Sequence, residues 1–103
     1  MTPAQPTVTH NTDKRQFELR IDDTLSIVTY FKPDEQTLAL AHTEVDPALE
    51  GRGVGSSLVK QVLEYAEAHN LKIVPLCPFV AAYIKRHPDW KRVVSTTHST
   101  SDF

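Results

Sequence analysis

The sequence predicts an α+β fold in which an antiparallel β-meander is followed by a β-α-β-α unit on one mixed sheet. In the first half, apolar and polar residues alternate with the period of two that is typical of strands, and turn residues separate the runs. After residue 53, apolar residues recur at helical spacing, and β-branched runs alternate with these helical runs. The 103 residues suffice for one domain with one modest core.

The first half contains three predicted strands. In the second, Leu25, Ile27 and Phe31 share one phase, which indicates a half-buried strand. The dipeptide 22–23 and the segment 32–36 carry the Asp and Pro residues typical of turns. The strands are "FELRI" (17–21), "TLSIVTYF" (24–31) and "TLALAHTEV" (37–45).

The second half changes to helical periodicity. An apolar stripe predicts a helix over 53–69, and the run 71–76 reads as a strand parallel to the third, because a helix connects the two. A second helix is predicted over 78–86, where Pro88 stops it. The segment "WKRVV" (90–94) is a candidate last strand.

Composition restricts the partners and the compartment. Residues 1–14 and 95–103 are polar and read as disordered tails around a domain at 15–94. With a net charge of −2, the chain has no strong electrostatic field that would attract nucleic acid. No apolar run reaches the roughly 20 residues of a membrane span. Cys77 is the only cysteine, and the N-terminus does not resemble a signal peptide, so we expect a cytoplasmic protein. One cysteine and scattered histidines give no zinc-ligand spacing.

All three glycines of the chain, Gly51, Gly53 and Gly55, lie between the third strand and the first helix. Unpaired amides and the dipole of a helix N-terminus attract phosphate, glycines allow close approach, and Arg52 adds a positive charge. A tight turn is the alternative reading. Neither the Walker A pattern nor G-x-G-x-x-G is present, since Ser56 stands where the latter needs glycine.

The segment "EGRGVGSSLV" resembles motif A of the GNAT acetyltransferases, [QR]-x-x-G-x-[GA]. Together with "HTEVDPAL" before it and "LKIVPLCPFVAAYIKRHPDW" after it, the chain is similar to the minimal GNAT-like proteins over about residues 16–93. Glu50 departs from the family pattern, because a carboxylate at this position repels a pyrophosphate unless it points away.

The resemblance implies a truncated GNAT fold whose third and fourth strands form a splayed parallel pair. The pantetheine arm of acetyl-CoA would lie in this splay, and the pyrophosphate would lie on the amides that follow the third strand. The cofactor-binding residues that the resemblance implies are Val45, Gly51, Arg52, Gly53, Val54, Gly55 and Ser56.

Glu44 and His42 are candidate general bases. By period two, Leu38, Leu40, His42 and Glu44 share one face of the third strand, with the two titratable residues at the end where the site is expected. Amine acetylation needs a base that removes a proton from the ammonium group. The alternative for each is an ordinary polar residue at a strand end.

Cys77 and Tyr83 complete the catalytic candidates. Cys77 lies where the fourth strand meets the second helix, and a helix N-terminus favours the thiolate that could accept the acetyl group. The alternative is an inert buried thiol. Tyr83 aligns with a family tyrosine that protonates the departing thiolate; its alternative is packing against the sheet.

The predicted function is an acetyl-CoA-dependent N-acetyltransferase whose acceptor is an unidentified amine. The amine attacks acetyl-CoA directly or attacks an acetyl-Cys77 intermediate. Little chain precedes Phe17, so the acceptor side is expected to be open, which favours a protein or peptide amine. A non-catalytic acyl-CoA-binding or protein-interaction module, and an unrelated α+β domain with turn glycines, are the alternatives. The basic residues that suit a helix end, a CoA 3′-phosphate or, less well, nucleic acid are Lys85, Arg86, Lys91 and Arg92.

Overall fold

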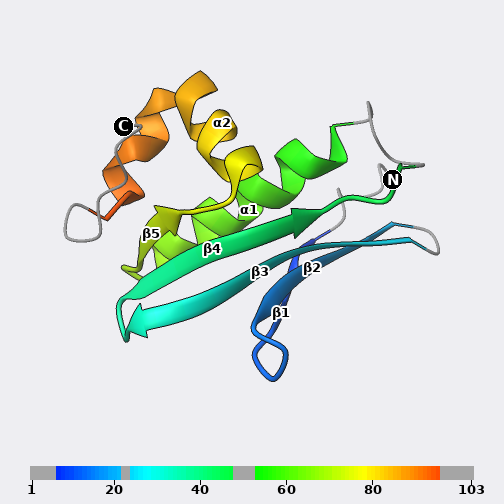
Figure 1. The fold of residues 1–103 in the computed structure, drawn as a ribbon, viewed down its shortest axis with the longest axis horizontal. Coiled ribbons are helices and arrows are strands. Elements are labelled where there is room, and N and C mark those ends of the chain that lie inside the picture. Colours follow the sequence, from blue (N-terminus) through cyan, green and yellow to red (C-terminus); the bar gives the residue numbers. More distant parts are fainter. Residues whose placement is uncertain (1–6, 22–23, 48–52, 96–103) are drawn as a thin grey trace, which may run out of the picture.

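The computed structural model describes residues 7–21, 24–47 and 53–95, and it shows a five-stranded mixed sheet with a layer of helices (Figure 1). The strand order is β1-β2-β3-β4-β5; the first four strands are antiparallel and β5 is parallel to β4. This architecture confirms the predicted α+β class. The elements are β1 (Thr9–Asn11), β2 (Gln16–Ile21), β3 (Thr24–Asp34), β4 (Thr37–Glu44), α1 (Val54–Ala68), β5 (Lys72–Pro75), α2 (Pro78–Arg86) and the 3₁₀ helix η2 (Pro88–Val93).

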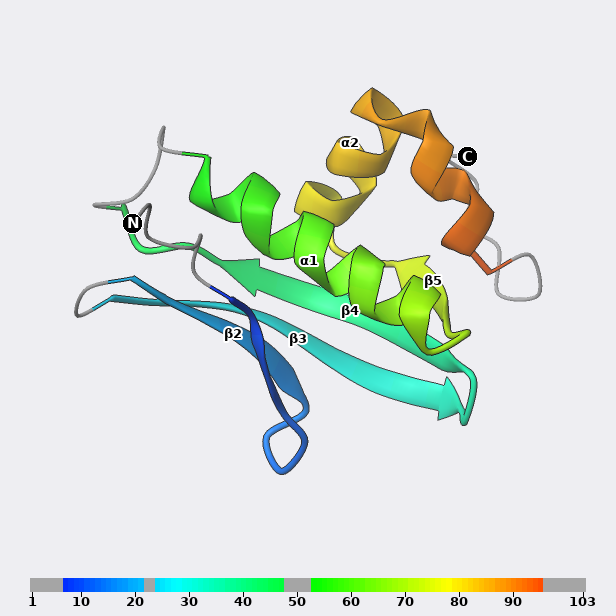
Figure 2. The ribbon, with the colours of Figure 1, turned by 180° about the vertical axis from the view of Figure 1, so that it is seen from behind.

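The helices cover one face of the sheet and leave much of the other open. In Figure 1 the strands β3 and β4 lie in front of α1, whereas the view from behind in Figure 2 shows α1 in front of the sheet with α2 beside it. Val28 and Tyr30 of β3 face the core and are buried. Leu25, Ile27 and Phe31 share a phase as predicted, but this phase faces the open side, where Leu25 is 38% and Phe31 46% exposed.

A β-bulge at Ala41 divides β4 into two parts. Thr29 of β3 pairs with His42, whereas the next residue, Tyr30, pairs with Leu40, so Ala41 is an extra residue on β4. Successive residues of β3 point to opposite faces, and therefore Leu40 and His42 also lie on opposite faces. The prediction that Leu38, Leu40, His42 and Glu44 share one face is wrong for this reason.

The parallel strands β4 and β5 separate after a short paired stretch. Thr37–Leu40 pairs with Lys72–Pro75, whereas β4 continues to Glu44. The last backbone hydrogen bond at the fork, among the described residues, is one of 3.0 Å from the N–H of Cys77 to the carbonyl oxygen of Leu40. Beyond this point no residue of the described segments pairs with β4 on its β5 side, so the predicted splay is present.

Two predictions at the ends of the domain are wrong. Residues 9–11, assigned to a disordered tail, form β1, which pairs with β2 and brings His10 beside Phe17. Residues 88–93 form a 3₁₀ helix rather than a strand, because Pro88 and Asp89 suit a first helical turn. Within the described segment 90–94, Val94 alone makes a β-bridge, to Ile73.

Candidate functional site

The N-terminus of α1 leaves backbone amides available for an anion. Gly53 is the N-cap in the left-handed conformation, with φ of 74°, and the first helical bond runs from Ser57 N–H to its carbonyl oxygen at 3.0 Å. The amides of Val54, Gly55 and Ser56 therefore have no partner within the helix. No side chain of the described residues caps this helix end. These amides form one side of the predicted phosphate site.

The structure tests only part of the predicted glycine loop. Gly51 and Arg52, together with Glu50, lie outside the described residues. Val45 follows β4 and packs, partly buried, against the core. The described parts of the loop are thus residues 45–47, which follow β4, and Gly53 with the first turn of α1.

Cys77 lies at the fork between β4 and β5. It is the N-cap of α2 and is 5% exposed. Its Sγ lies 3.3 Å from Oγ1 of Thr43, which is paired with the buried Val28 and so faces the same side of the sheet as the helices. Thr43 was missed in the sequence, because the unpredicted bulge at Ala41 is what turns it toward the thiol.

His42 and Glu44 lie on the other side of β4, on the open face. His42 Nε2 is 3.3 Å from Glu44 Oε2, and their side chains are 61% and 65% exposed. The thiol and this pair therefore approach the same strand end from opposite faces. An amine on the open face could reach the pair without crossing the helix layer.

Tyr83 is buried on α2, and its contacts are with η2 and the end of α2. Burial raises the pKa of the Tyr83 phenol, and a hydrogen bond with Trp90 opposes this shift. Its ring lies 4.5 Å from that of His87. Packing of Tyr83 against the sheet and its role as a general acid both stay predictions.

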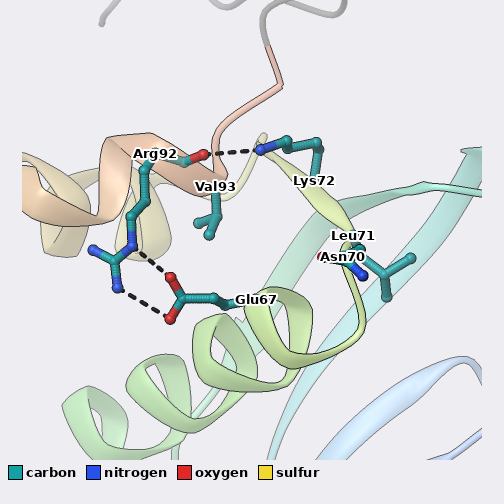
Figure 3. Close-up of a pocket in the computed structure, with 6 residues that line it drawn as sticks. All are labelled: Glu67, Asn70, Leu71, Lys72, Arg92 and Val93. Atoms are coloured by element: carbon teal, nitrogen blue, oxygen red, sulfur yellow. Dashed lines mark hydrogen bonds and ion pairs between the residues drawn. The ribbon is translucent and has the colours of Figure 1, made fainter.

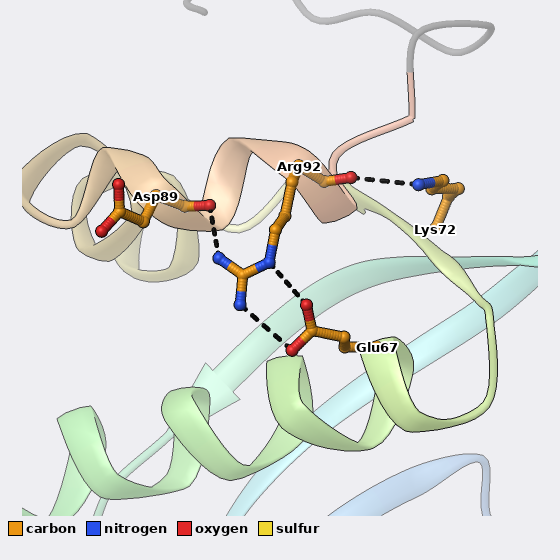
Figure 4. A network of polar contacts seen from close by, with 4 residues as sticks. All are labelled: Glu67, Lys72, Asp89 and Arg92. Carbon is orange, nitrogen blue, oxygen red and sulfur yellow. Dashed lines mark hydrogen bonds and ion pairs between the residues drawn. The ribbon is translucent and has the colours of Figure 1, made fainter.

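A shallow pocket of about 290 Å³ lies at the opposite end of β5 from the fork (Figure 3). Arg92 donates two hydrogen bonds to the Glu67 carboxylate, at 2.5 and 3.0 Å, and a third to the carbonyl oxygen of Asp89 (Figure 4). Lys72 Nζ donates to the carbonyl oxygen of Arg92 at 3.0 Å. The bonds with Glu67 hold η2 on α1 and the bond from Lys72 holds it on β5, and they engage Arg92, one of the cations suggested for a CoA phosphate.

His10 forms an aromatic cluster that the sequence did not predict. Its ring is stacked on Phe17, with centroids 4.4 Å apart, and its nitrogens lie 2.5 and 3.1 Å from the hydroxyl groups of Tyr30 and Tyr65. Burial lowers the pKa of His10, and the charges of His69 and Lys32 add to this shift. An apolar stacking partner and two hydroxyl groups suit a neutral imidazole that ties β1 to the core.

Among the described residues, every helix is too short or too polar to span a membrane. In the same segments, no group of three or more metal-ligating side chains comes together.

Comparisons with known proteins agree with this geometry. The family model of the GCN5-related N-acetyltransferases matches residues 16–93. Protein NATD1 from Xenopus tropicalis and from mouse are each 30% identical over 83 residues, which covers 79% of this chain and 76% of theirs. The NMR structure of a GCN5-like protein from Staphylococcus aureus superposes with a TM-score of 0.69 at 27% identity, covering 90% of this chain and 91% of that one.

Proposed function

Since the chain belongs to the GCN5-related N-acetyltransferase family, we propose that it transfers the acetyl group of acetyl-CoA to an amine, with the thioester held at the fork between β4 and β5. One observation carries the proposal: Cys77 lies at this fork with its thiol 3.3 Å from the Thr43 hydroxyl. The fork and the thiol bring a reactive group to the place where the family fold would receive a thioester.

The described residues fit acetyl-CoA at three points. The part of β4 beyond Leu40 has backbone groups on its β5 side that the pantetheine amides could pair with, as an added strand would. The free amides at the start of α1 suit the pyrophosphate. Cys77 then lies beyond the inner end of the arm, where the acetyl group is expected.

In the cysteine route, the Cys77 thiolate attacks the carbonyl carbon of the thioester. The bond between that carbon and the CoA sulfur breaks, and the proton that left Cys77 ends on the CoA thiolate. The acceptor amine then attacks acetyl-Cys77, loses a proton and restores the thiol. The Thr43 hydroxyl can donate a hydrogen bond to the thiolate in both steps.

In the direct route, the amine attacks acetyl-CoA itself and Cys77 only lines the site. Both routes need a base for the ammonium proton, and the exposed pair of His42 and Glu44 at the end of β4 is suited to this task. The routes therefore differ in the acyl intermediate and not in the base.

Intact-mass analysis after mixing the protein with acetyl-CoA, without an acceptor, separates the routes. The cysteine route gives a single added acetyl group that is absent in Cys77→Ser, a nearly isosteric control. Turnover by Cys77→Ala together with no adduct on the wild type would remove the cysteine route and leave direct transfer. An acceptor panel of basic peptides, polyamines and amino sugars tests the preference for a peptide amine; turnover confined to small amines would contradict it.

A non-catalytic acyl-CoA-binding or protein-interaction module is the second candidate. The observation that favours it is the open sheet face, where Leu25 and Phe31 are exposed and no helix of the described residues precedes β4. This candidate predicts that acetyl-CoA binds but neither an acetyl adduct nor turnover appears with any acceptor.

A further inference from the structure

Gly53, the N-cap of α1, and Gly55, in its first turn, are glycines for different structural reasons. Gly53 has a positive φ of 74°, and a Cβ built on it would meet nothing within 4 Å. Gly55 has no such backbone requirement, but a Cβ there would lie 2.5 Å from Cζ of Phe79. The three nearest atoms to that Cβ, at 2.5, 3.2 and 3.3 Å, all belong to the Phe79 ring. Gly55 is therefore the residue that lets the tip of this ring approach the first turn of α1.

Phe79 joins the first turns of the two helices. It is the second residue of α2, two positions after Cys77, and its ring reaches across to α1. The side chain nevertheless stays 39% exposed. The exposed part of this apolar ring is a surface left for a further contact.

The Phe79 ring lies between the places expected for the two ends of the proposed ligand. Cys77 marks the end where the thioester is expected, and the first turn of α1 marks the pyrophosphate end. The chain that joins these two groups must pass from one helix N-terminus to the other, and Phe79 lies between them, because its backbone belongs to the first turn of α2 and its ring reaches the first turn of α1.

We propose that Phe79 is an apolar wall for the pantetheine arm of CoA, and that Gly55 acts as a positioning residue that seats the ring. This inference rests on the proposed function and deepens it. It assigns the requirement for glycine at residue 55 to the aromatic ring rather than to close approach of a phosphate. Without the ring, alanine at residue 55 would be tolerated.

A double-mutant cycle tests the inference, with the dissociation constant of CoA measured by calorimetry for the full chain. Loss of the ring in Phe79→Ala is expected to weaken binding about tenfold. Gly55→Ala is expected to weaken it severalfold, and the double variant should bind within about twofold of Phe79→Ala, because the two residues act as one unit.

Phe31→Ala is the matched control, since Phe31 is also an exposed phenylalanine but lies on the open face of β3. Its affinity should equal that of the wild type. Thermal unfolding checks that each variant folds, and Phe79→Leu replaces Phe79→Ala if the latter does not.

Two outcomes overturn the inference while the proposed function stands. The first is an equal loss from Gly55→Ala with and without the ring, which would mean that the added methyl group meets the phosphate. The second is unchanged affinity in Phe79→Ala. No binding by the wild type would instead overturn the proposed function, and this inference with it.

Discussion

The Sγ of Cys77 lies 3.3 Å from the Oγ1 of Thr43, across the fork where β4 and β5 separate. The two residues are 34 positions apart in the chain, and a bulge in β4 makes the contact possible. The hydroxyl can accept from the thiol or donate to the thiolate, so it suits both states of a nucleophile.

We predict that Thr43→Val slows alkylation of Cys77 by iodoacetamide at neutral pH. Valine keeps the β-branched shape, but it removes a hydrogen bond that stabilises the reactive thiolate. The loss of a bond to a charged group predicts a decrease of about tenfold. The alkylation rate reports on Cys77 alone, because the chain has a single cysteine.

Thr43→Ser is the control for this experiment, since it keeps the hydroxyl group and should react nearly as fast as the wild type. Equal rates for Thr43→Val and the wild type would show that the hydroxyl group has no part in activating the thiol.

The bulge at Ala41 can be removed without changing the rest of the register. Leu40 already faces Tyr30 and His42 already faces Thr29, so deletion of Ala41 would leave a regular ladder from Ile27 to Phe31 of β3, and the second register shift, between Phe31 and Asp34, would stay as it is. A bulge bends its strand and increases the twist. We therefore expect the deletion to bring the part of β4 beyond Leu40 closer to the direction of β5, so that the splay between the two strands narrows. The variant should fold but bind CoA more than about tenfold more weakly.

Calorimetry and thermal unfolding of the Ala41 deletion check this prediction, with Ala41→Ser as the control that keeps the bulge. A deletion variant that folds and binds CoA as tightly as the wild type would mean that the splay does not depend on the bulge.

Glu44→Gln is predicted to separate the two halves of the reaction. The amide cannot remove a proton from the acceptor ammonium, so turnover should fall by about a hundredfold. Formation of the acetyl adduct on Cys77 needs no such base and should be unchanged in intact-mass spectra. Unchanged turnover would exclude Glu44 as the base and leave His42, which His42→Gln tests in the same assay.

Because of His10, we predict that the free energy of unfolding falls in mild acid. Its pKa is lowered in the folded protein, chiefly by burial, so the unfolded chain takes up a proton at higher pH than the folded protein. The free energy of unfolding is therefore greatest above the ordinary histidine pKa of 6.5 and falls as the pH drops below it. The lowered pKa values of Glu18 and Glu67 act in a lower window, below 4.5.

Denaturant unfolding between pH 4.5 and pH 7.5 measures this dependence, and His10→Gln should reduce the slope near pH 6. The neighbouring titratable groups are Tyr30, Tyr65, His69 and Lys32, and the variant keeps all of them. A slope that is the same in the wild type and the variant would assign the effect to another group.

Periodicity predicted the regular elements of this chain well. The helix predicted over 53–69 is observed as Val54–Ala68, and the second helix has the predicted bounds, because the apolar stripe and Pro78 act locally. The prediction of a strand over 90–94 was wrong. Its β-branched residues suggested a strand, whereas Pro88 and the contacts of Arg92 favour a 3₁₀ helix.

The candidate site was predicted only in part, for physical reasons. A bulge leaves no mark in a period-two pattern, so the faces of His42 and Thr43 could not be read from the sequence. Nor could the contact between Gly55 and Phe79, which depends on how two helices pack. Cys77 was correctly placed between strand and helix, because a proline at the first helical position marks that junction.

Calorimetric titration of the full chain with acetyl-CoA tests the central claim most directly. The fork, the free amides of α1 and the position of Cys77 predict saturable binding of one ligand per chain. The absence of measurable binding at millimolar ligand, for a protein that is folded by thermal unfolding, would contradict the proposed function and leave the glycines of α1 with structural roles alone.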